Sequence, residues 1–215
     1  MVLMRLFSLL IGYALGHIQT SYILGKTVKK IDIRDYGSKS SGMTNTLRVM
    51  GPKYAVVVIL VDVMKSMGAY IICSAIFGGE GSFFAFGDGV NGVLPGFYGS
   101  VGAVLGHMFP VYMRLRGGKS IACGIGLILA VNLPMAAIIL GAAMAIIAIF
   151  RFISLASIIS AISLPFMFRL FGYPPEAVII GAFLAVLLTY KHKDNIKRLL
   201  SGTENVVYGK KKLKN

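Results

Sequence analysis

Three polar, basic segments carry most of the groups in this chain that are suited to binding phosphate. They are island 1 (36–48, YGSKSSGMTNTLR), island 2 (106–123, GHMFPVYMRLRGGKSIAC) and island 3 (192–204, HKDNIKRLLSGTE). Each combines glycines, whose backbone N–H groups can approach an anion closely, with hydroxyls, amides and fixed cations. Long apolar runs separate the islands, so only a folded bundle could bring them together. This pattern indicates an enzyme or carrier that acts on a phosphorylated substrate at a membrane surface.

Island 1 has the make-up of an anion-binding turn followed by a guanidinium group. Gly37 and Gly42 permit sharp turns on either side of Ser38, and such turns expose backbone N–H groups to an anion. Arg48 adds a planar cation suited to bidentate contact with phosphate. A hydroxyl and an amide complete the set, on Thr44 and Asn45. A solvated basic loop would have a similar composition, so island 1 alone is only moderately specific.

Island 2 places a lysine directly after two glycines, where a helix is predicted to begin. Gly117, Gly118 and Lys119 combine the groups of a phosphate-binding loop, although their spacing is not that of a Walker A motif. A helix starting near Ser120 would direct its N-terminal dipole toward a bound anion. His107 precedes this loop, and a lone histidine near an apolar face is more often a hydrogen-bonded core residue than a catalyst.

Island 3 is predicted to form a helix with its polar side chains on one face. His192, Asn195 and Leu199 recur at helical spacing, which places them together. Residues 201–204 (SGTE) would end this helix. Glu204 is expected to pair with an arginine from another island, in an essentially structural role.

One charged pair lies inside an apolar run. Asp62 and Lys65 have i, i+3 spacing, and charges within such a run are costly unless they are paired or functional. A structural ion pair is favoured slightly over a direct role in chemistry. The three histidines lie far apart without metal-ligand spacing, so neither a metal nor another cofactor is expected. The two cysteines lack CxxC spacing and are expected to be buried thiols.

The remaining composition indicates an all-α integral membrane protein. The chain of 215 residues is 56% hydrophobic and 14% charged, with a mean hydropathy of +0.78, which is outside the range of ordinary soluble domains. The run 121–150 is longer than one straight span, and Asn132-Leu133-Pro134 predicts a turn within it. The candidate spans are 3–24, 54–78, 93–113, both halves of 121–150, 152–168 and 176–190.

The distribution of charge decides between one span and two in the run 121–150. With two helices there, one side of the membrane holds all but three of the chain's 22 Lys and Arg residues. The positive-inside rule then favours about seven transmembrane helices, with the N-terminus outside and the C-terminus in the cytoplasm. We expect a single membrane-embedded domain, 1–215, with all three islands on the cytoplasmic side. The glycine-rich segment 79–92 would be a connector on the opposite side.

The formal net charge of +14 does not indicate nucleic acid, because the basic residues flank apolar runs as they do in membrane proteins. Anionic membrane lipids are the expected partners, above all for the lysines at 210–214. No required protein partner is expected. A transporter of a small phosphorylated anion would also use basic loops, but usually on both faces and often with an internal repeat. A non-catalytic lipid-binding or assembly protein is a third alternative.

The three islands resemble, in order and spacing, the three cytoplasmic motifs of the bacterial acyl-phosphate:glycerol-3-phosphate acyltransferase (PlsY) family. The first motif is matched at Gly37, Ser38, Gly42, Thr44, Asn45 and Arg48. The second is matched at Gly106, His107, Phe109, Pro110, Gly117, Gly118 and Lys119. The third is matched at His192, Asn195, Ile196, Arg198, Leu199, Gly202 and Glu204. The D-x-x-K pattern in the second span also recurs in the family.

Four positions depart from the family pattern. They are Ser40 for asparagine, Met43 for alanine, Ser120 for the last glycine of the second motif and Cys123 for a common threonine. A side chain at Ser120 could crowd a bound phosphate. Altered substrate preference is therefore a possible consequence, whereas loss of activity is not expected because the charged and amide groups are intact.

The resemblance implies transfer of a fatty acyl group from acyl phosphate to the 1-hydroxyl of glycerol 3-phosphate at the bacterial cytoplasmic (inner) membrane. The implied products are lysophosphatidate and inorganic phosphate. The implied catalytic residues are Ser38, Arg48, Lys119, His192 and Asn195. The implied substrate-binding residues are Gly37, Gly42, Thr44, Asn45, His107, Gly117, Gly118 and Ser120. The implied structural supports are Glu204, Asp62 and Lys65.

Overall fold

The computed structural model describes residues 2–78 and 94–207, and every regular element in these two ranges is a helix. The chain divides into two compact units, unit 1 up to Leu133 and unit 2 from Pro134 onward, and each is described by itself. The predicted connector at 79–92 and the basic tail at 210–214 lie outside the described residues.

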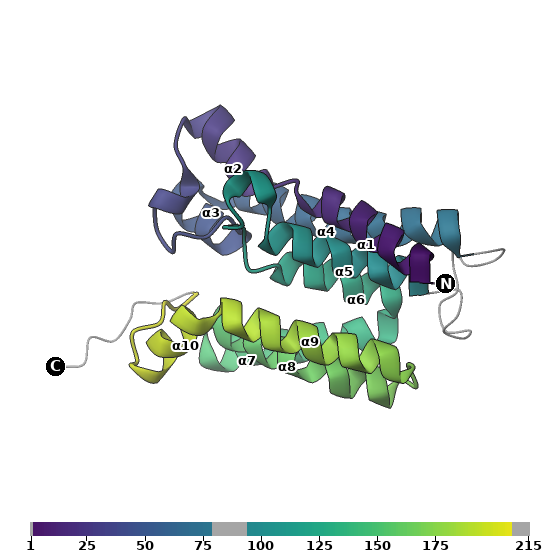
Figure 1. Cartoon of the computed structure of the whole chain (residues 1–215). Helices are drawn as coiled ribbons and strands as arrows, with labels where there is room; N and C mark the ends of the chain where they lie inside the picture. The colour runs from purple at the N-terminus through teal and green to yellow at the C-terminus, as the bar shows by residue number, and fades with distance from the viewer. Residues whose placement is uncertain (1, 79–93, 208–215) are drawn as a thin grey trace. The chain divides into compact units, whose positions relative to one another are not determined.

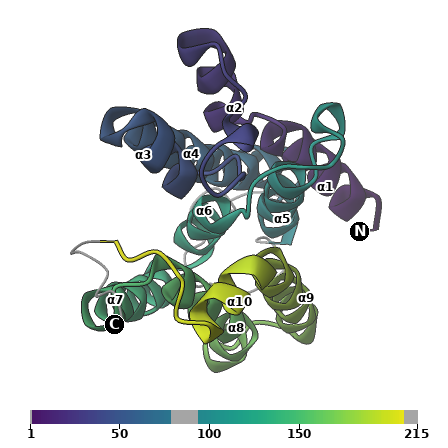
Figure 2. The same cartoon turned by 90° about the vertical axis from the view of Figure 1, so that its left-hand side faces the viewer.

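Unit 1 is a bundle of long helices with shorter elements at one end (Figures 1 and 2). Helices α1 and α4 both pack against α5, and α6 packs against α4 and α5. The short helix α3 and the segment that leads into α6 lie at the end opposite the N-terminus. The α-helices are α1 (Val2–Gly16), α2 (Thr20–Leu24), α3 (Met43–Met50), α4 (Pro52–Phe77), α5 (Leu94–Met108) and α6 (Ile121–Val131). The other helical segments are a π-helix, Gly25–Lys29, and two 3₁₀ helices, Ile33–Asp35 and Val111–Met113.

Glycines allow α1 and α5 to pack with their backbones in contact. A Cβ added at Gly12 would overlap the carbonyl of Gly99, and one added at Gly16 would overlap the carbonyl of Ala103. Small residues at such interfaces are typical of helices in membranes, where close backbone approach replaces a hydrophobic driving force. The contact brings the end of α1 beside His107, in the last turn of α5.

Unit 2 contains three longer helices and one short one. Helix α8 packs along α9, and α10 continues from α9 after a bend of 61°. Proline begins α9, where its missing N–H costs nothing, and Gly202 adopts a φ of +66° just beyond α10. The elements are α7 (Leu133–Phe150), α8 (Ile153–Leu170), α9 (Pro175–Lys191) and α10 (Lys193–Leu200).

Among the described residues, four helices are long and apolar enough to cross a membrane. They are Val2–Lys29, Pro52–Phe77, Leu133–Phe150 and Ile153–Leu170, and α9 with α10 would make a fifth if the bent pair is one span. Helix α6 is apolar but short, as the sequence predicted for the first half of 121–150. The predicted break in that run is confirmed, because Asn132 ends α6 in an extended conformation and α7 begins at the next residue.

Two predicted spans differ from the observed helices. The run 3–24 is interrupted at His17-Ile18-Gln19, between α1 and α2. The run 93–113 is helical only to Met108, because Pro110 restricts the preceding residue and cannot donate the next helical hydrogen bond. The first interruption precedes island 1 in the sequence, and the second lies within island 2. Residues at and next to both interruptions make the contacts described below.

Candidate functional site

Island 1 consists of an irregular turn followed by α3, and Asn45 holds the turn in shape. The Asn45 side chain is buried, and its Oδ1 accepts a hydrogen bond from the Ser38 backbone N–H at 2.7 Å. Its Nδ2 donates to the carbonyls of Ile33 at 3.0 Å and Tyr36 at 3.1 Å. Asn45 was predicted to bind substrate, but in this structure its amide organises the backbone on which Ser38 is presented.

The turn requires a glycine at position 37. Gly37 has a φ of +60°, and a Cβ there would overlap Asn45 Oδ1. The other predicted residues of island 1 differ in exposure: Ser38, Gly42 and Thr44 are partly buried, and Arg48 is exposed on α3. Thr46, which was not selected from the sequence, is fully buried, and its Oγ1 lies 3.1 Å from the Gly42 carbonyl oxygen and 2.9 Å from Ser21 Oγ.

The glycine loop of island 2 folds back onto the end of α5. The N–H of Gly117 donates to the Met108 carbonyl at 3.2 Å, and the N–H of Gly118 donates to the His107 carbonyl at 3.1 Å. A Cβ at Gly118 would overlap His107 Nε2 and would lie 2.9 Å from the Ser41 carbonyl oxygen. Glycine is therefore needed for close approach, and the loop lies directly against the edge of the His107 ring.

Ser120 occupies the residue before α6, as predicted for the start of a helix. Its φ is +60°, a region that favours glycine, which is the residue that the family pattern has at this position. The buried hydroxyl donates to the Val104 carbonyl on α5 at 2.7 Å. This hydrogen bond holds the Ser120 side chain on the backbone of α5.

A buried glutamine joins islands 1 and 2. Gln19 is fully buried in the interruption between α1 and α2, and its Nε2 donates to the His107 carbonyl at 3.0 Å. Its Oε1 accepts the Ser41 hydroxyl of island 1 at 3.0 Å. Sequence reasoning missed Gln19 because it lies within a predicted span. The polar run HIQTS inside that span is the signal that could have identified it.

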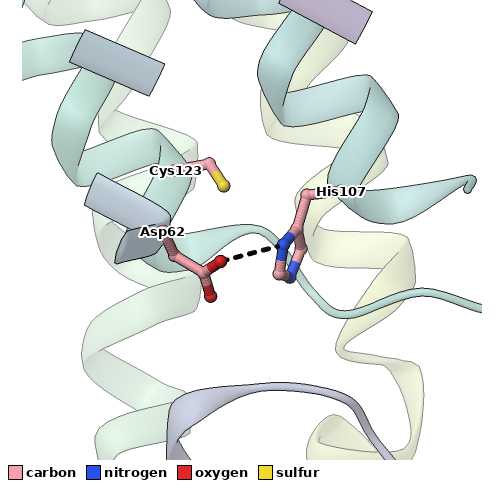
Figure 3. A group of neighbouring side chains, drawn as sticks. All are labelled: Asp62, His107 and Cys123. Carbon is pink, nitrogen blue, oxygen red and sulfur yellow. Dashed lines mark ion pairs between the residues drawn. The ribbon is translucent and has the colours of Figure 1, made fainter. Parts of the chain in front are cut away.

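The charged pair in α4 is confirmed as an ion pair, and it includes a third residue that the sequence did not connect to it. Lys65 Nζ lies 2.8 Å from Asp62 Oδ1 and 2.7 Å from His107 Nδ1. The separation between His107 Nδ1 and Asp62 Oδ1 is 3.4 Å (Figure 3). All three side chains are buried, so a charge on any one of them depends on the other two.

Cys123 lies beside this group, and no spacing in the sequence predicts the cluster. One ligand atom from each of Asp62, His107 and Cys123 falls within 4.8 Å of the others (Figure 3), a spacing that could hold a metal ion. The donor types suit a borderline cation such as Zn²⁺. The Lys65 ammonium, however, already lies in contact with both Asp62 and His107. The positive charge beside Asp62 and His107 is therefore that of the Lys65 ammonium.

A second ion pair lies in the segment just before island 1 and contacts island 2. Arg34 donates from Nε to Asp32 Oδ1 at 3.0 Å and from Nη2 to Asp32 Oδ2 at 2.7 Å. Its Nη1 reaches the Met113 carbonyl at 3.4 Å. The bidentate hydrogen bonds from Arg34 lower the pKa of Asp32 to about 2, against the smaller opposing effect of burial. Neither residue was selected from the sequence.

Island 3 differs from its prediction at its first residue. His192 is the junction between α9 and α10 rather than a residue within one continuous helix, because the backbone leaves the helical region there and the axis bends by 61°. Asn195 is in the first turn of α10, and both side chains are buried. The His192 ring donates from Nδ1 to the Leu188 carbonyl at 2.8 Å, which leaves the lone pair of the neutral ring on Nε2.

Glu204 pairs within island 3, and not with an arginine of another island as expected. Its Oε1 accepts from Asn195 Nδ2 at 3.2 Å, and its Oε2 accepts from Arg198 Nε at 2.9 Å. The carboxylate is buried, so these two donors supply the hydrogen bonds that compensate for its removal from water. The contact holds the segment after α10 against the helix and fixes the orientation of the Asn195 amide.

The structure thus brings islands 1 and 2 together within unit 1. Ser41, Gln19 and the His107 carbonyl form a continuous chain of hydrogen bonds, and the Gly118 backbone completes it. Lys119, the predicted cation of the loop, is partly buried immediately after Gly118. Island 3 forms its own hydrogen-bonded cluster in unit 2. Each island by itself offers hydroxyls and cations, and islands 2 and 3 each add an imidazole; such groups bind phosphorylated compounds.

Comparison with known proteins agrees with this chemistry. A family model described as "Glycerol-3-phosphate acyltransferase" matches residues 6–202, a range that contains islands 1 and 2 and nearly all of island 3. A glycerol-3-phosphate acyltransferase from Thermosynechococcus vestitus is 41% identical over 205 residues, covering 91% of each chain. One from Halalkalibacterium halodurans is 38% identical over 210 residues, covering 95% of this chain and 96% of its own.

A solved structure is similar over nearly the same range. It is a crystal structure of PlsY (YgiH), an integral membrane glycerol 3-phosphate acyltransferase, in its glycerol 3-phosphate form. The TM-score is 0.82 at 31% sequence identity, and the match covers 95% of this chain and 96% of that one. The lysophosphatidic acid form of the same enzyme matches with a TM-score of 0.79. On these similarities, the chain belongs to the glycerol-3-phosphate acyltransferase family.

Proposed function

We propose that this protein transfers a fatty acyl group from acyl phosphate to the 1-hydroxyl of glycerol 3-phosphate, the first acylation in phospholipid synthesis. The observation that carries the proposal is the continuous family match over residues 6–202, together with a fold similar to an enzyme solved with glycerol 3-phosphate. The products are lysophosphatidate and inorganic phosphate. The bond that forms is an ester to the glycerol oxygen, and the bond that breaks joins the acyl carbon to the phosphate oxygen.

The reaction requires two phosphate-binding positions and little covalent chemistry. Phosphate is a good leaving group, so correct placement of the hydroxyl and stabilisation of negative charge can supply most of the catalysis. We assign glycerol 3-phosphate to the loop of Gly117, Gly118 and Lys119, whose backbone is held by α5. Binding of the acyl phosphate is assigned to Ser38, Arg48, His192 and Asn195. The two assignments could be exchanged, and the same groups would then serve the other substrate.

Two groups are candidates to receive the proton of the glycerol hydroxyl. One is the leaving phosphate itself, which carries negative charge. The other is His192, whose hydrogen bond to the Leu188 carbonyl puts the lone pair of the neutral ring on Nε2. A pH–rate profile that keeps its shape in His192→Gln, and changes only in scale, would favour the phosphate.

The location is also part of the proposal. We infer a multi-pass protein of the bacterial cytoplasmic (inner) membrane, with about seven transmembrane helices, an external N-terminus and an active site facing the cytoplasm. The concentration of Lys and Arg in the islands and their flanks supports this orientation. The apolar helices found among the described residues provide several of the required spans. Long-chain acyl phosphate and membrane lipids would then reach the protein from the bilayer.

The test is product formation by the purified full-length protein in detergent or lipid nanodiscs. Palmitoyl phosphate and labelled glycerol 3-phosphate would be supplied to the wild type, Ser38→Ala and Arg48→Ala. Arg169→Ala is the matched control, because Arg169 is an exposed arginine on α8 outside the islands. Labelled lysophosphatidate from the wild type and Arg169→Ala, with at least a hundredfold less from the other two, is the expected result.

Other outcomes would separate the alternatives. No product from folded wild-type protein, over several chain lengths and lipid compositions, would overturn the proposed reaction. Uptake of glycerol 3-phosphate into vesicles without product would instead identify a transporter of a small phosphorylated anion. Full activity in Ser38→Ala and Arg48→Ala would leave the reaction standing but refute the role given to island 1.

A further inference from the structure

The ammonium group of Lys65 contacts three polar groups, two through hydrogen bonds and one as an ion pair. Lys65 Nζ lies 2.7 Å from the Ile18 carbonyl oxygen, 2.7 Å from His107 Nδ1 and 2.8 Å from Asp62 Oδ1. An ammonium group is a donor of three hydrogen bonds and accepts none. The three neighbours come from three separate segments, the α1–α2 interruption, α5 and α4. Lys65 is therefore held in one position from three directions.

This arrangement determines which nitrogen of His107 carries a proton. Because Lys65 can only donate, His107 Nδ1 must accept with its lone pair, and the proton of the neutral ring then lies on Nε2. A hydrogen on Nδ1 would face the Lys65 ammonium at 2.7 Å and would have only Asp62 Oδ1, at the longer distance of 3.4 Å, to accept it. An alkylamine holds its proton far more tightly than an imidazole does.

The protonated edge of His107 lies at the glycine loop of island 2. A Cβ at Gly118 would overlap His107 Nε2, so this nitrogen lies against the Gly118 backbone. The His107 carbonyl is itself fixed by donors from Gly118 at 3.1 Å and from Gln19 at 3.0 Å. Both the position of the ring and the direction of its Nε2–H are thus determined by buried contacts.

We propose that Lys65 is a positioning residue that makes His107 a permanent Nε2–H donor to a phosphate oxygen bound at the Gly117–Gly118–Lys119 loop. The inference rests on the proposed function for the identity of the ligand, but the assignment of the proton does not. Asp62 acts one step further away, because its carboxylate retains the charge of Lys65 inside the helix bundle. The Lys65 ammonium thereby supplies a positive charge beside Asp62 and His107, in the cluster whose spacing could hold a metal cation.

The other two histidines of the chain provide internal references for a direct measurement. His17 donates from Nδ1 to the Tyr13 carbonyl at 2.8 Å and accepts at Nε2 from the Val111 N–H at 3.1 Å. His192 donates from Nδ1 to the Leu188 carbonyl. When neutral, both rings carry the proton on Nδ1, so His107 should be the one histidine of the three with the opposite tautomer.

The experiment is ¹⁵N NMR of the full chain labelled at histidine, in nanodiscs, with assignment by His17→Gln and His192→Gln. The expected spectrum shows an unprotonated Nδ1 and a protonated Nε2 for His107 alone, and loss of that state in Lys65→Met. Addition of glycerol 3-phosphate or inorganic phosphate should shift the His107 Nε2 signal. A wild-type His107 that is protonated on Nδ1, or on both nitrogens, would overturn the proposal without reference to activity. An unchanged tautomer in Lys65→Met, or no shift with either anion, would overturn the positioning role or the ligand role respectively.

Kinetics provide a second and independent test. If Lys65 acts through His107, Lys65→Met and His107→Asn should each reduce kcat/KM by about a hundredfold. The double variant should then be no worse than His107→Asn alone. His107→Gln, whose amide can place an N–H near the position of Nε2, should retain more activity than His107→Asn. Cys73→Ser, at a buried cysteine of α4 outside the cluster, is the control and should remain within a few-fold of wild type.

The outcomes distinguish this inference from the proposed reaction. Multiplicative losses in the double variant would show that Lys65 acts independently of His107 and would contradict the inference. If Lys65→Met does not fold, the wild-type spectrum still tests the tautomer of His107. The comparison of His107→Gln with His107→Asn then tests its role as an N–H donor. A correct tautomer in a protein that makes no lysophosphatidate would refute the reaction while leaving the proton assignment intact.

Discussion

Asn45 Oδ1 accepts a hydrogen bond from the backbone N–H of Ser38 at 2.7 Å, and this bond joins α3 to the turn before the helix. The same side chain donates to the carbonyls of Ile33 and Tyr36. One amide thus contacts three backbone groups between the 3₁₀ helix Ile33–Asp35 and α3. The position of Ser38 therefore depends on the hydrogen bonds that Asn45 makes to this turn.

The first prediction concerns that amide. Asn45→Ala removes all three hydrogen bonds and takes away the acceptor of the Ser38 backbone N–H, and loss of such a partner costs about 1–3 kcal/mol. Asn45→Asp keeps the acceptor for Ser38 but loses both donors. We expect kcat/KM to fall by at least tenfold in both variants, and further in Asn45→Ala. The control is Leu47→Ala, an exposed position on the same helix; wild-type rates in Asn45→Ala would contradict the role given to the turn.

The second prediction concerns close packing of the glycine loop. Gly118→Ala would place a methyl group against His107 Nε2 and the Ser41 carbonyl, so islands 1 and 2 must separate or the loop must move. The same substitution at Gly124, on α6, meets no atom within 4 Å. We expect Gly118→Ala to lower kcat/KM by a hundredfold or more, while Gly124→Ala stays near wild type. Equal activity of the two alanine variants would show that the loop does not need this contact.

The third prediction concerns the buried carboxylate of island 3. Arg198→Ala leaves Glu204 with one donor fewer in a site that excludes water, and should lower the free energy of unfolding by about 1–3 kcal/mol. Glu204→Gln removes the negative charge. It should therefore lower the free energy of unfolding less in the Arg198→Ala background than in the wild type. Thermal unfolding of the two single variants and the double variant measures this coupling. Lys197→Ala, at an exposed position on α10, is the control, and strict additivity would rule out the pair as a structural support.

The fourth prediction follows from the lowered pKa of Asp32. Its pKa of about 2, against an ordinary value of 3.8, means that the folded state favours the carboxylate. This stabilising contribution is fully present above about pH 4 and is lost as the pH falls toward 2. Asp32→Asn should therefore be less stable than the wild type at pH 6, with a difference in Tm that narrows between pH 4 and pH 2. Asp35→Asn, an exposed neighbour, should show no such narrowing; a constant difference for Asp32→Asn would mean that the Arg34 pair is not the cause.

The helical class, the break at Asn132 and the start of α6 near Ser120 were predictable because each depends on local sequence. Apolar periodicity, a residue before proline and a glycine-rich helix start act within a few positions of the chain. The interruption after α1 was missed, although the polar run HIQTS within the predicted span is a local sign of it. The partners of Gln19 were not predictable, because they depend on the packing of α1 against α5 and island 1.

The same limit applies to the candidate site. Types and spacing selected Asp62 and Lys65 as a pair and His107 separately. Because 42 residues separate Lys65 from His107, their hydrogen bond depends on how α4 and α5 pack. The reverse occurred with Glu204, whose partner is Arg198, six residues away. An arginine from another island was expected because the turn at Gly202, which returns the chain onto α10, was read only as the end of the helix.

The most direct test of the account measures donor and stoichiometry together. Purified protein would receive glycerol 3-phosphate with either palmitoyl phosphate or palmitoyl-coenzyme A, and lysophosphatidate and inorganic phosphate would be quantified in the same reaction. The account predicts equal amounts of the two products from palmitoyl phosphate, and none from the thioester. Lysophosphatidate from palmitoyl-coenzyme A at a comparable rate, or phosphate release without lysophosphatidate, would contradict the claim that acyl phosphate is the donor for this acyl transfer.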